Sequence, residues 1–131
     1  MHDAFVSYAT ADSRAALAAC EAMSALGIRL WLDVEEIPRR AAWRDAVQLG
    51  IRDARVVLVA VGRGWEDSPA CRYELAVAIE QRRPLIAMRL PGHRGRMPPM
   101  LPAGTEIVAA TRLDAAAAAV AARLASYRNS A

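Results

Sequence analysis

The sequence predicts an α/β domain in which five parallel strands form one sheet with helices on both faces. Short apolar runs alternate with segments of helical periodicity along the chain, as in repeated strand–helix–strand units joined by right-handed crossovers. One run, RVVLVAVG at 55–62, is apolar without alternation, which indicates a central strand covered on both faces. The common order for five such strands is 2-1-3-4-5.

Five apolar runs have the length of strands and are bounded by turn residues or helical patterns. These runs are DAFVSY (3–8), IRLWL (28–32), RVVLVAVG (55–62), PLIAMRL (84–90) and TEIVAA (105–110). Two further segments are expected to be loops. One is DVEEIPRRAA (33–42), and the other is PGHRGRMPPMLPAG (91–104), which contains too much proline and glycine for regular structure.

Two of the four expected helices have clear end signals. The first begins with Asp12 or Ser13 as its N-cap and ends at Gly27. The third follows the central strand and has Ser68 at its N-cap. Pro69 then occupies the first helical position, where its missing N–H costs nothing. We expect this third helix over 68–80.

The second helix is expected from about Trp43 to Asp53, and the last is the alanine-rich segment 114–128, capped by Asp114. Each helix has apolar residues at helical spacing, which should face the sheet. They are Leu17, Cys20 and Leu26 in the first helix, Val47, Leu49 and Ile51 in the second, and Val120 and Leu124 in the last.

Length and composition fit one cytoplasmic domain over residues 1–131. The chain has no internal repeat or linker, and its size is sufficient for a hydrophobic core without metals or disulfides. Cys20 and Cys71 fall within predicted helices, as expected of core thiols in a reducing compartment. The N-terminus lacks a signal-peptide pattern and no apolar run reaches the ~20 residues of a membrane span. We therefore expect no membrane partner.

The charge pattern does not favour nucleic-acid binding. All 17 basic residues are arginine, and the formal net charge is +3. The arginines are scattered along the chain and do not gather on one predicted face, whereas a nucleic-acid footprint requires a clustered basic surface. We expect no direct nucleic-acid partner.

Glu74 is the residue of the third helix that does not fit its surroundings. It lies on the flank of an apolar stripe formed by Cys71, Leu75, Ala78 and Ile79. In the strand order 2-1-3-4-5, ligands bind outside the carboxyl ends of strands one and three, where the order reverses. From the flank, the carboxylate could reach this point. The alternative is a rim residue that is half solvated or paired with an arginine.

Several segments resemble the motifs of TIR (Toll/interleukin-1 receptor) domains. DAFVSYATAD (3–12) is similar to the first signature box of that family, and GIRLWLDVEEI (27–37) to its second strand entering the BB loop. AWRDAVQLGIRDARVVLVAVGRGWEDSPACRYEL (42–75) is similar to the next helix, the central strand and the helix with the catalytic glutamate. The match extends in order from residue 3 to about 90.

The resemblance implies a flavodoxin-like fold, in agreement with the fold predicted from periodicity. It also implies an NAD hydrolase of the bacterial NAD-cleaving type, which cuts the nicotinamide–ribose bond with one catalytic glutamate, here Glu74. Some members of the family cyclise the product. NAD is then the substrate, and no cofactor is expected. No metal site is expected either, since His2 and His93 are the only histidines.

A single carboxylate suits this chemistry. Nicotinamide in NAD is already a cationic leaving group and needs no general acid, unlike the glycosidic oxygen for which glycosidases use two carboxyl groups. The remaining tasks are to orient the ribose and to stabilise the oxocarbenium charge. A carboxylate hydrogen-bonded to the ribose hydroxyls in a site with little water could do both.

The resemblance assigns substrate contacts to further residues. Tyr8 and the backbone of Ala9 lie where the family contacts the substrate. Trp43 corresponds to an aromatic residue that stacks on the nucleotide in some members, with a helix-start anchor packed on the sheet as the alternative. The arginines that could pair with the pyrophosphate are Arg39, Arg40 and Arg44. For any one of these arginines, a solvated position is the alternative.

The sequence departs from the family pattern at two places. The BB loop reads EEIPRRAAW (35–43) and lacks the glycine common there. The aromatic residue often found shortly before the glutamate is replaced by Ala70, and Trp65 could supply the missing wall. Trp31 lies inside a strand and is expected in the core.

Two other classes compete with the enzyme. A TIR domain can act as a non-catalytic module that binds other TIR domains, although Glu74 at the enzymatic position favours catalysis. A phospho-acceptor receiver shares the five-stranded topology, but it needs an aspartate at the end of the central strand and a lysine after the fifth. The central strand here ends in VAVGRG and the chain has no lysine, which excludes a receiver.

The resemblance also implies the partners. Enzymatic TIR domains commonly self-assemble and are fused to, or associated with, a sensor domain that triggers assembly. We expect this domain to be the effector portion of a longer protein in prokaryotic antiviral defence, with low activity when isolated.

Overall fold

The structure, a computed structural model, describes residues 2–32 and 42–129 and confirms the predicted sheet. All neighbouring strands are parallel, in the order β2-β1-β3-β4-β5. The strands are β1 (His2–Ser7), β2 (Leu30–Leu32), β3 (Ala54–Val61), β4 (Leu85–Arg89) and β5 (Glu106–Ala109). β3 is the longest strand and is buried at every position except Arg55, as its unbroken apolar run predicted.

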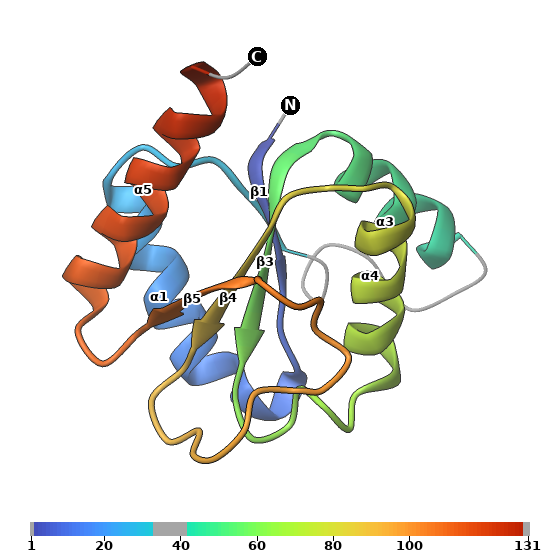
Figure 1. Ribbon diagram of the computed structural model, residues 1–131, viewed down its shortest axis with the longest axis horizontal. Helices are drawn as coiled ribbons and strands as arrows, with labels where there is room; N and C mark the ends of the chain where they lie inside the picture. Colours follow the sequence, from blue (N-terminus) through green and yellow to red (C-terminus); the bar gives the residue numbers. More distant parts are fainter. Residues whose placement is uncertain (1, 33–41, 130–131) are drawn as a thin grey trace.

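The described residues contain four α-helices, which cover both faces of the sheet. They are α1 (Ser13–Ala25), α3 (Trp43–Arg52), α4 (Pro69–Glu80) and α5 (Leu113–Asn129), and a short 3-10 turn η1 (Thr10–Asp12) precedes α1. α1 and α5 lie side by side on one face, and α3 and α4 lie together on the other (Figure 1). This is the flavodoxin-like arrangement. None of the described helices is both long and apolar enough to span a bilayer.

Successive residues of β1 point to opposite faces and therefore belong to two separate cores. Ala4 and Val6 pack with α1 and α5, whereas Phe5 packs with α3 and α4. Ser7 follows Phe5 at two residues' distance and shares its face. The carboxyl end of β1 thus directs a hydroxyl group toward α4.

Three residues expected to face the core are instead exposed. Leu26, Leu49 and Ile79 have exposed fractions of 54%, 47% and 44%. Leu26 lies just beyond the last turn of α1. The buried positions of α3 are Trp43, Val47, Gly50 and Ile51, and Leu49 falls between them on the opposite side. In α4, Val77 is buried in place of Ile79.

Other core predictions are confirmed. Val120 and Leu124 are buried on the inner face of α5, and Cys20 and Cys71 are buried free thiols. Trp31 is half-buried and stacks on Phe5, with ring centroids 4.9 Å apart. The prediction that Trp31 lies in the core therefore holds only in part, and β2 is an edge strand of the sheet.

Two helix ends follow their sequence signals, whereas the two aspartates expected as N-caps do not act as caps; Asp114 lies within the first turn of α5 and not before it. The Ser68 side chain accepts a hydrogen bond from the Cys71 backbone N–H at 3.2 Å, as an N-cap should. Gly27 follows α1 with a φ of 82°, the left-handed conformation that glycine favours. Asp12 occupies the position before α1, but its side chain makes no capping bond. Its carboxylate has a different partner, described below.

Candidate functional site

Glu74 lies on the buried face of α4, in the second turn of the helix. Its side chain is only 2% exposed. The prediction that Glu74 lies on the flank of the apolar stripe is therefore wrong, as is the alternative of a half-solvated rim residue. α4 packs against both the sheet and α3, so its buried face is wide enough to include position 74.

The Glu74 carboxylate contacts the end of β1. Ser7 Oγ donates to Glu74 Oε1 at 2.7 Å, and the indole Nε1 of Trp65 lies 3.2 Å from the same Ser7 Oγ. Ser7 and Trp65 are both fully buried. A carboxylate, a hydroxyl group and an indole N–H thus form one buried polar cluster among the apolar side chains between the sheet and α4.

This cluster lies where the order of the sheet reverses. Ser7 is the last residue of β1 and is paired with Val59 near the end of β3. β2 lies on one side of β1 and β3 on the other, so the connections leaving β1 and β3 diverge to opposite faces. In open α/β sheets, ligands bind at the carboxyl edge at such a point. The sequence prediction placed Glu74 near this edge, and the structure brings it there through Ser7.

Asp12 ties the loop after β1 to the loop after β3. Its Oδ2 accepts a hydrogen bond from the backbone N–H of Gly64 at 3.0 Å. Gly62 lies so close to the Asp12 carboxyl group that a Cβ at this position would overlap it. The two loops that flank the candidate site are therefore held together by one carboxylate and two glycines.

We expect Gly62→Ala to destabilise the domain by about 1–3 kcal/mol, because the new methyl group collides with Asp12. Chemical denaturation measures this loss. The double variant Gly62→Ala with Asp12→Ala removes the collision, so its loss should be smaller than the sum of the two single losses. Strict additivity of the two changes would contradict the close approach of Asp12 and Gly62.

The side chains of Tyr8 and Ala9, which follow β1, point to opposite faces of the sheet. Tyr8 is buried in the core formed with α1 and α5, whereas Ala9 is buried on the face of α3 and α4. The Tyr8 ring and the Glu74 carboxylate therefore lie on opposite faces of the sheet. Ser7, which lies between Val6 and Tyr8 in the sequence, is the residue of this turn whose side chain meets Glu74.

Trp43 and Arg44 both lie near Tyr73. Trp43 is 8% exposed and packs on Tyr73 with ring centroids 5.4 Å apart, as a helix-start anchor would. Arg44 is exposed, and its guanidinium lies 5.1 Å from the centroid of the same ring. Arg39 and Arg40 lie outside the described residues. Tyr73 itself was not predicted as a site residue.

The position of the missing family aromatic is filled by small side chains. Ala70 is buried at the start of α4. Trp65, which we expected to supply the missing wall, is fully buried and directs its N–H into the cluster with Ser7. Its role in the structure is therefore to contact the Ser7 hydroxyl group that donates to Glu74.

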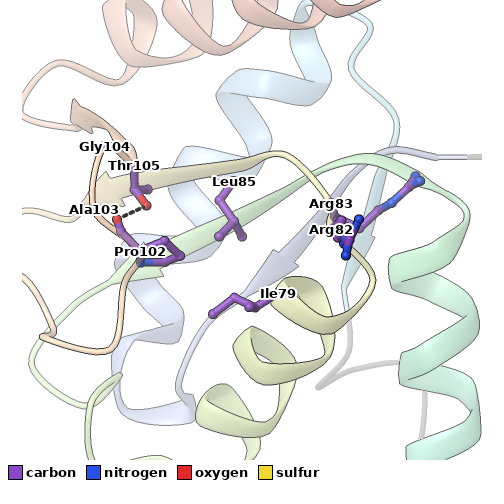
Figure 2. A pocket seen from close by; sticks show the side chains of 8 residues that line it. All are labelled: Ile79, Arg82, Arg83, Leu85, Pro102, Ala103, Gly104 and Thr105. Carbon is purple, nitrogen blue, oxygen red and sulfur yellow. Dashed lines mark hydrogen bonds between the residues drawn. The ribbon is translucent and has the colours of Figure 1, made fainter.

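Two of the pockets formed by the described residues lie away from the Glu74 cluster. One of about 340 Å³ lies between the end of α4 and the segment before β5, and is lined by residues that include Ile79, Arg83 and Thr105 (Figure 2). The other, of about 400 Å³, lies beside the start of α1 and includes Asp12 and Arg63. Neither is lined by Glu74. No group of three possible metal-ligating side chains occurs within residues 2–32 and 42–129.

Sequence reasoning missed Ser7 and the actual role of Asp12. A signal for Ser7 was present, since it is a polar residue at the end of a strand that is buried from Asp3 onward. Strand alternation alone places it on the same face as Phe5. Asp12 was interpreted as a helix cap because aspartate before a helix usually caps it. Its contact with Gly64 spans 52 positions in the sequence, and local patterns carry no information on such a contact.

The fold and motifs agree with comparisons to known proteins. The family model for the TIR domain matches residues 4–125. The TIR domain of the Toll-related receptor TRR-2 from Hydra magnipapillata superimposes with a TM-score of 0.75 at 12% identity, covering 98% of this chain and 99% of that chain. A search of curated protein sequences returned no significant match.

Two structures of larger proteins are also similar. The TIR-STING receptor from C. gigas has a TM-score of 0.69 at 22% identity, over 92% of this chain and 40% of that one. The TIR domains of the activated Roq1 resistosome, which recognises the pathogen effector XopQ, have a TM-score of 0.58 at 20% identity, over 67% of this chain and 57% of that one. At these identities, the similarity concerns the fold. With the family model matching most of its length, the chain belongs to the TIR domain family.

Proposed function

We propose that this TIR domain hydrolyses NAD between nicotinamide and ribose, with Glu74 as its catalytic residue. The observation that supports this proposal is the contact between the Glu74 carboxylate and Ser7 at the carboxyl end of β1, 2.7 Å apart. The carboxylate is thereby held beside the point of the sheet where ligands bind in folds of this topology. It is also enclosed by protein, and an anion stabilises positive charge far more strongly there than in water.

The proposed reaction needs two things from the protein. The ribose must be held with its anomeric carbon exposed to water, and the oxocarbenium charge that forms as nicotinamide leaves must be stabilised. Glu74 holds the ribose by accepting hydrogen bonds from its hydroxyl groups, and its negative charge stabilises the oxocarbenium ion. Arg39, Arg40 and Arg44 supply cations for the pyrophosphate, and the backbone of Ala9 and the ring of Trp43 complete the proposed substrate contacts. The Tyr8 ring lies across the sheet from Glu74 and takes no part in these contacts. No cofactor takes part.

The burial of Glu74 supports dependence on assembly. A side chain that is 2% exposed cannot contact a dinucleotide unless neighbouring groups shift. Association with other TIR domains, triggered by a fused or associated sensor, supplies the free energy for that shift. On this proposal the chain is the effector part of a prokaryotic antiviral defence protein, cytoplasmic in location, and is switched on when its copies assemble.

The assembly proposal predicts that turnover per protein molecule rises with protein concentration. We expect dilute monomer to release nicotinamide from NAD at least about tenfold more slowly than protein forced together, for example by fusion to an oligomeric carrier. Chromatography of NAD reaction mixtures measures the release, and it also separates linear from cyclic products. Equal turnover by dilute and assembled protein would refute the dependence on assembly.

A non-catalytic interaction module is the second candidate function. It is supported by exposed apolar residues on α4 and β5, where Ile79 borders the pocket of Figure 2 and Ile107 is 51% exposed. Single exposed apolar residues are common on monomers, so this support is weaker than that for the enzyme. An assembled wild-type protein that releases no nicotinamide but still binds other TIR domains would favour this second function.

A further inference from the structure

Ser7 and Trp65 form a short chain of hydrogen bonds that ends on the Glu74 carboxylate. Trp65 Nε1 lies 3.2 Å from Ser7 Oγ, which lies 2.7 Å from Glu74 Oε1. Ser7 and Trp65 have no exposed side-chain surface. In such a buried cluster, the side chains fix one another's positions, and removal of one partner leaves the others unsatisfied.

The chemistry of the three groups determines which atom donates and which accepts in each hydrogen bond. An indole N–H can only donate, so Ser7 Oγ accepts from Trp65. A serine hydroxyl group has a single proton, and the Glu74 carboxylate is its acceptor at 2.7 Å. That separation is ordinary for a hydrogen bond from a hydroxyl group to an oxygen atom. Trp65 thus orients the hydroxyl group, and Ser7 directs its proton at Glu74.

Burial alone opposes ionisation of a carboxyl group, because the charged form loses its hydration. A hydrogen-bond donor aimed at the carboxylate acts in the other direction and favours the charged form. For the proposed reaction the charged form is required, since a neutral carboxyl group does not stabilise an oxocarbenium ion. The donor on Oε1 also restricts the orientations open to the carboxylate.

We propose that Ser7 is a positioning residue that keeps Glu74 ionised and oriented, and that Trp65 acts on Glu74 through Ser7. This inference rests on the proposed NAD hydrolysis. The loop that contains Trp65 is itself fixed, because Ser68 N–H donates to the Trp65 carbonyl at 3.1 Å and Asp12 accepts from Gly64. The chain of contacts therefore extends from the β3–α4 loop to the candidate catalytic group.

Four variants test the proposal in assembled protein. Ser7→Ala removes the donor, Ser7→Thr retains a hydroxyl group, and Trp65→Phe removes only the N–H and part of the ring. Ser68→Ala is the matched control, because it also removes a serine hydrogen bond from α4 without touching Glu74. For each variant, kcat and KM for NAD are measured as a function of pH.

We expect kcat of Ser7→Ala to fall about tenfold or more while KM changes little. Removal of a donor to the charged form raises the pKa of Glu74, so activity should be lost at a higher pH as the solution is acidified. Trp65→Phe should show a smaller change of the same sign, and Ser7→Thr should recover part of the loss. Ser68→Ala should retain the wild-type pH profile.

A carboxyl-carbon NMR titration of the same variants separates this inference from the proposed function. If the assembled wild type releases no nicotinamide, NAD hydrolysis is wrong, and the titration then decides the role of Ser7 alone. A higher midpoint for Glu74 in Ser7→Ala than in wild type or Ser68→Ala supports the inference. An unchanged midpoint, or a Ser7→Ala enzyme with the wild-type kcat and acidic limb, overturns it.

Discussion

Glu74→Gln should reduce nicotinamide release from NAD by about 100-fold or more in assembled protein, the scale of loss seen when a transition-state charge loses its partner. Glutamine has nearly the same shape as glutamate, and its carbonyl oxygen can still accept the hydrogen bond from Ser7. The fold should therefore be retained. The amide lacks the negative charge that the oxocarbenium ion requires, so the loss should appear in kcat.

Glu80→Gln is the matched control for this change. Glu80 is the last residue of α4 and is exposed, so the same chemical substitution there leaves the buried cluster intact. We expect Glu80→Gln to retain wild-type turnover. Thermal melting of both variants checks that each is folded. A Glu74→Gln protein that is folded, assembled and as active as Glu80→Gln would rule out Glu74 as the catalytic residue.

Leu58→Ala should lower the free energy of unfolding by about 2–5 kcal/mol, the largest loss of stability we predict. Leu58 lies in β3 at the centre of the sheet and is fully buried in the core formed with α1 and α5. Removal of its side chain leaves a cavity in the most enclosed strand, where the surrounding sheet can relax little. Urea denaturation followed by circular dichroism measures the change.

Leu49→Ala is the control for this prediction, since it makes the same substitution at an exposed position of α3. Its effect should stay within about 0.5 kcal/mol. Similar losses in the two leucine variants would contradict the burial of β3 or the exposure of α3 at these positions. The pair therefore tests the layering of the sheet without reference to any activity.

The fold could be predicted from sequence because its signals are local. The unbroken apolar run of β3, Ser68 with Pro69 at the start of α4, and Gly27 after α1 each determine their element within a few residues. Their order along the chain then leaves few topologies open. The exposure of Leu49 was harder to predict. Helical spacing shows that a helix is amphipathic, but it fixes the centre of the buried face only within about one residue.

The candidate site was predicted in part. The position of Glu74 beside the carboxyl end of β1 followed from the topology and the family resemblance. The nearly complete burial of its side chain could not be predicted, because burial depends on how α4 packs against both α3 and the sheet. The contacts of Ser7 with Glu74 and Trp65 join residues 67 and 58 positions apart. Strand alternation could have indicated the face to which Ser7 points. The contact of Trp65 with Ser7 depends on the path of the loop after β3, which no local pattern specifies.

The shortness of β5 has a consequence for how copies of this domain can associate. β5 lies at one border of the sheet and spans only Glu106–Ala109. An added strand at this border would gain roughly two to four main-chain hydrogen bonds, each with a net contribution of about 1 kcal/mol. That gain is smaller than the several kcal/mol of motional freedom lost on association. Continuous β-pairing across this border is therefore too weak to drive polymerisation, and contacts between side chains must provide most of the affinity.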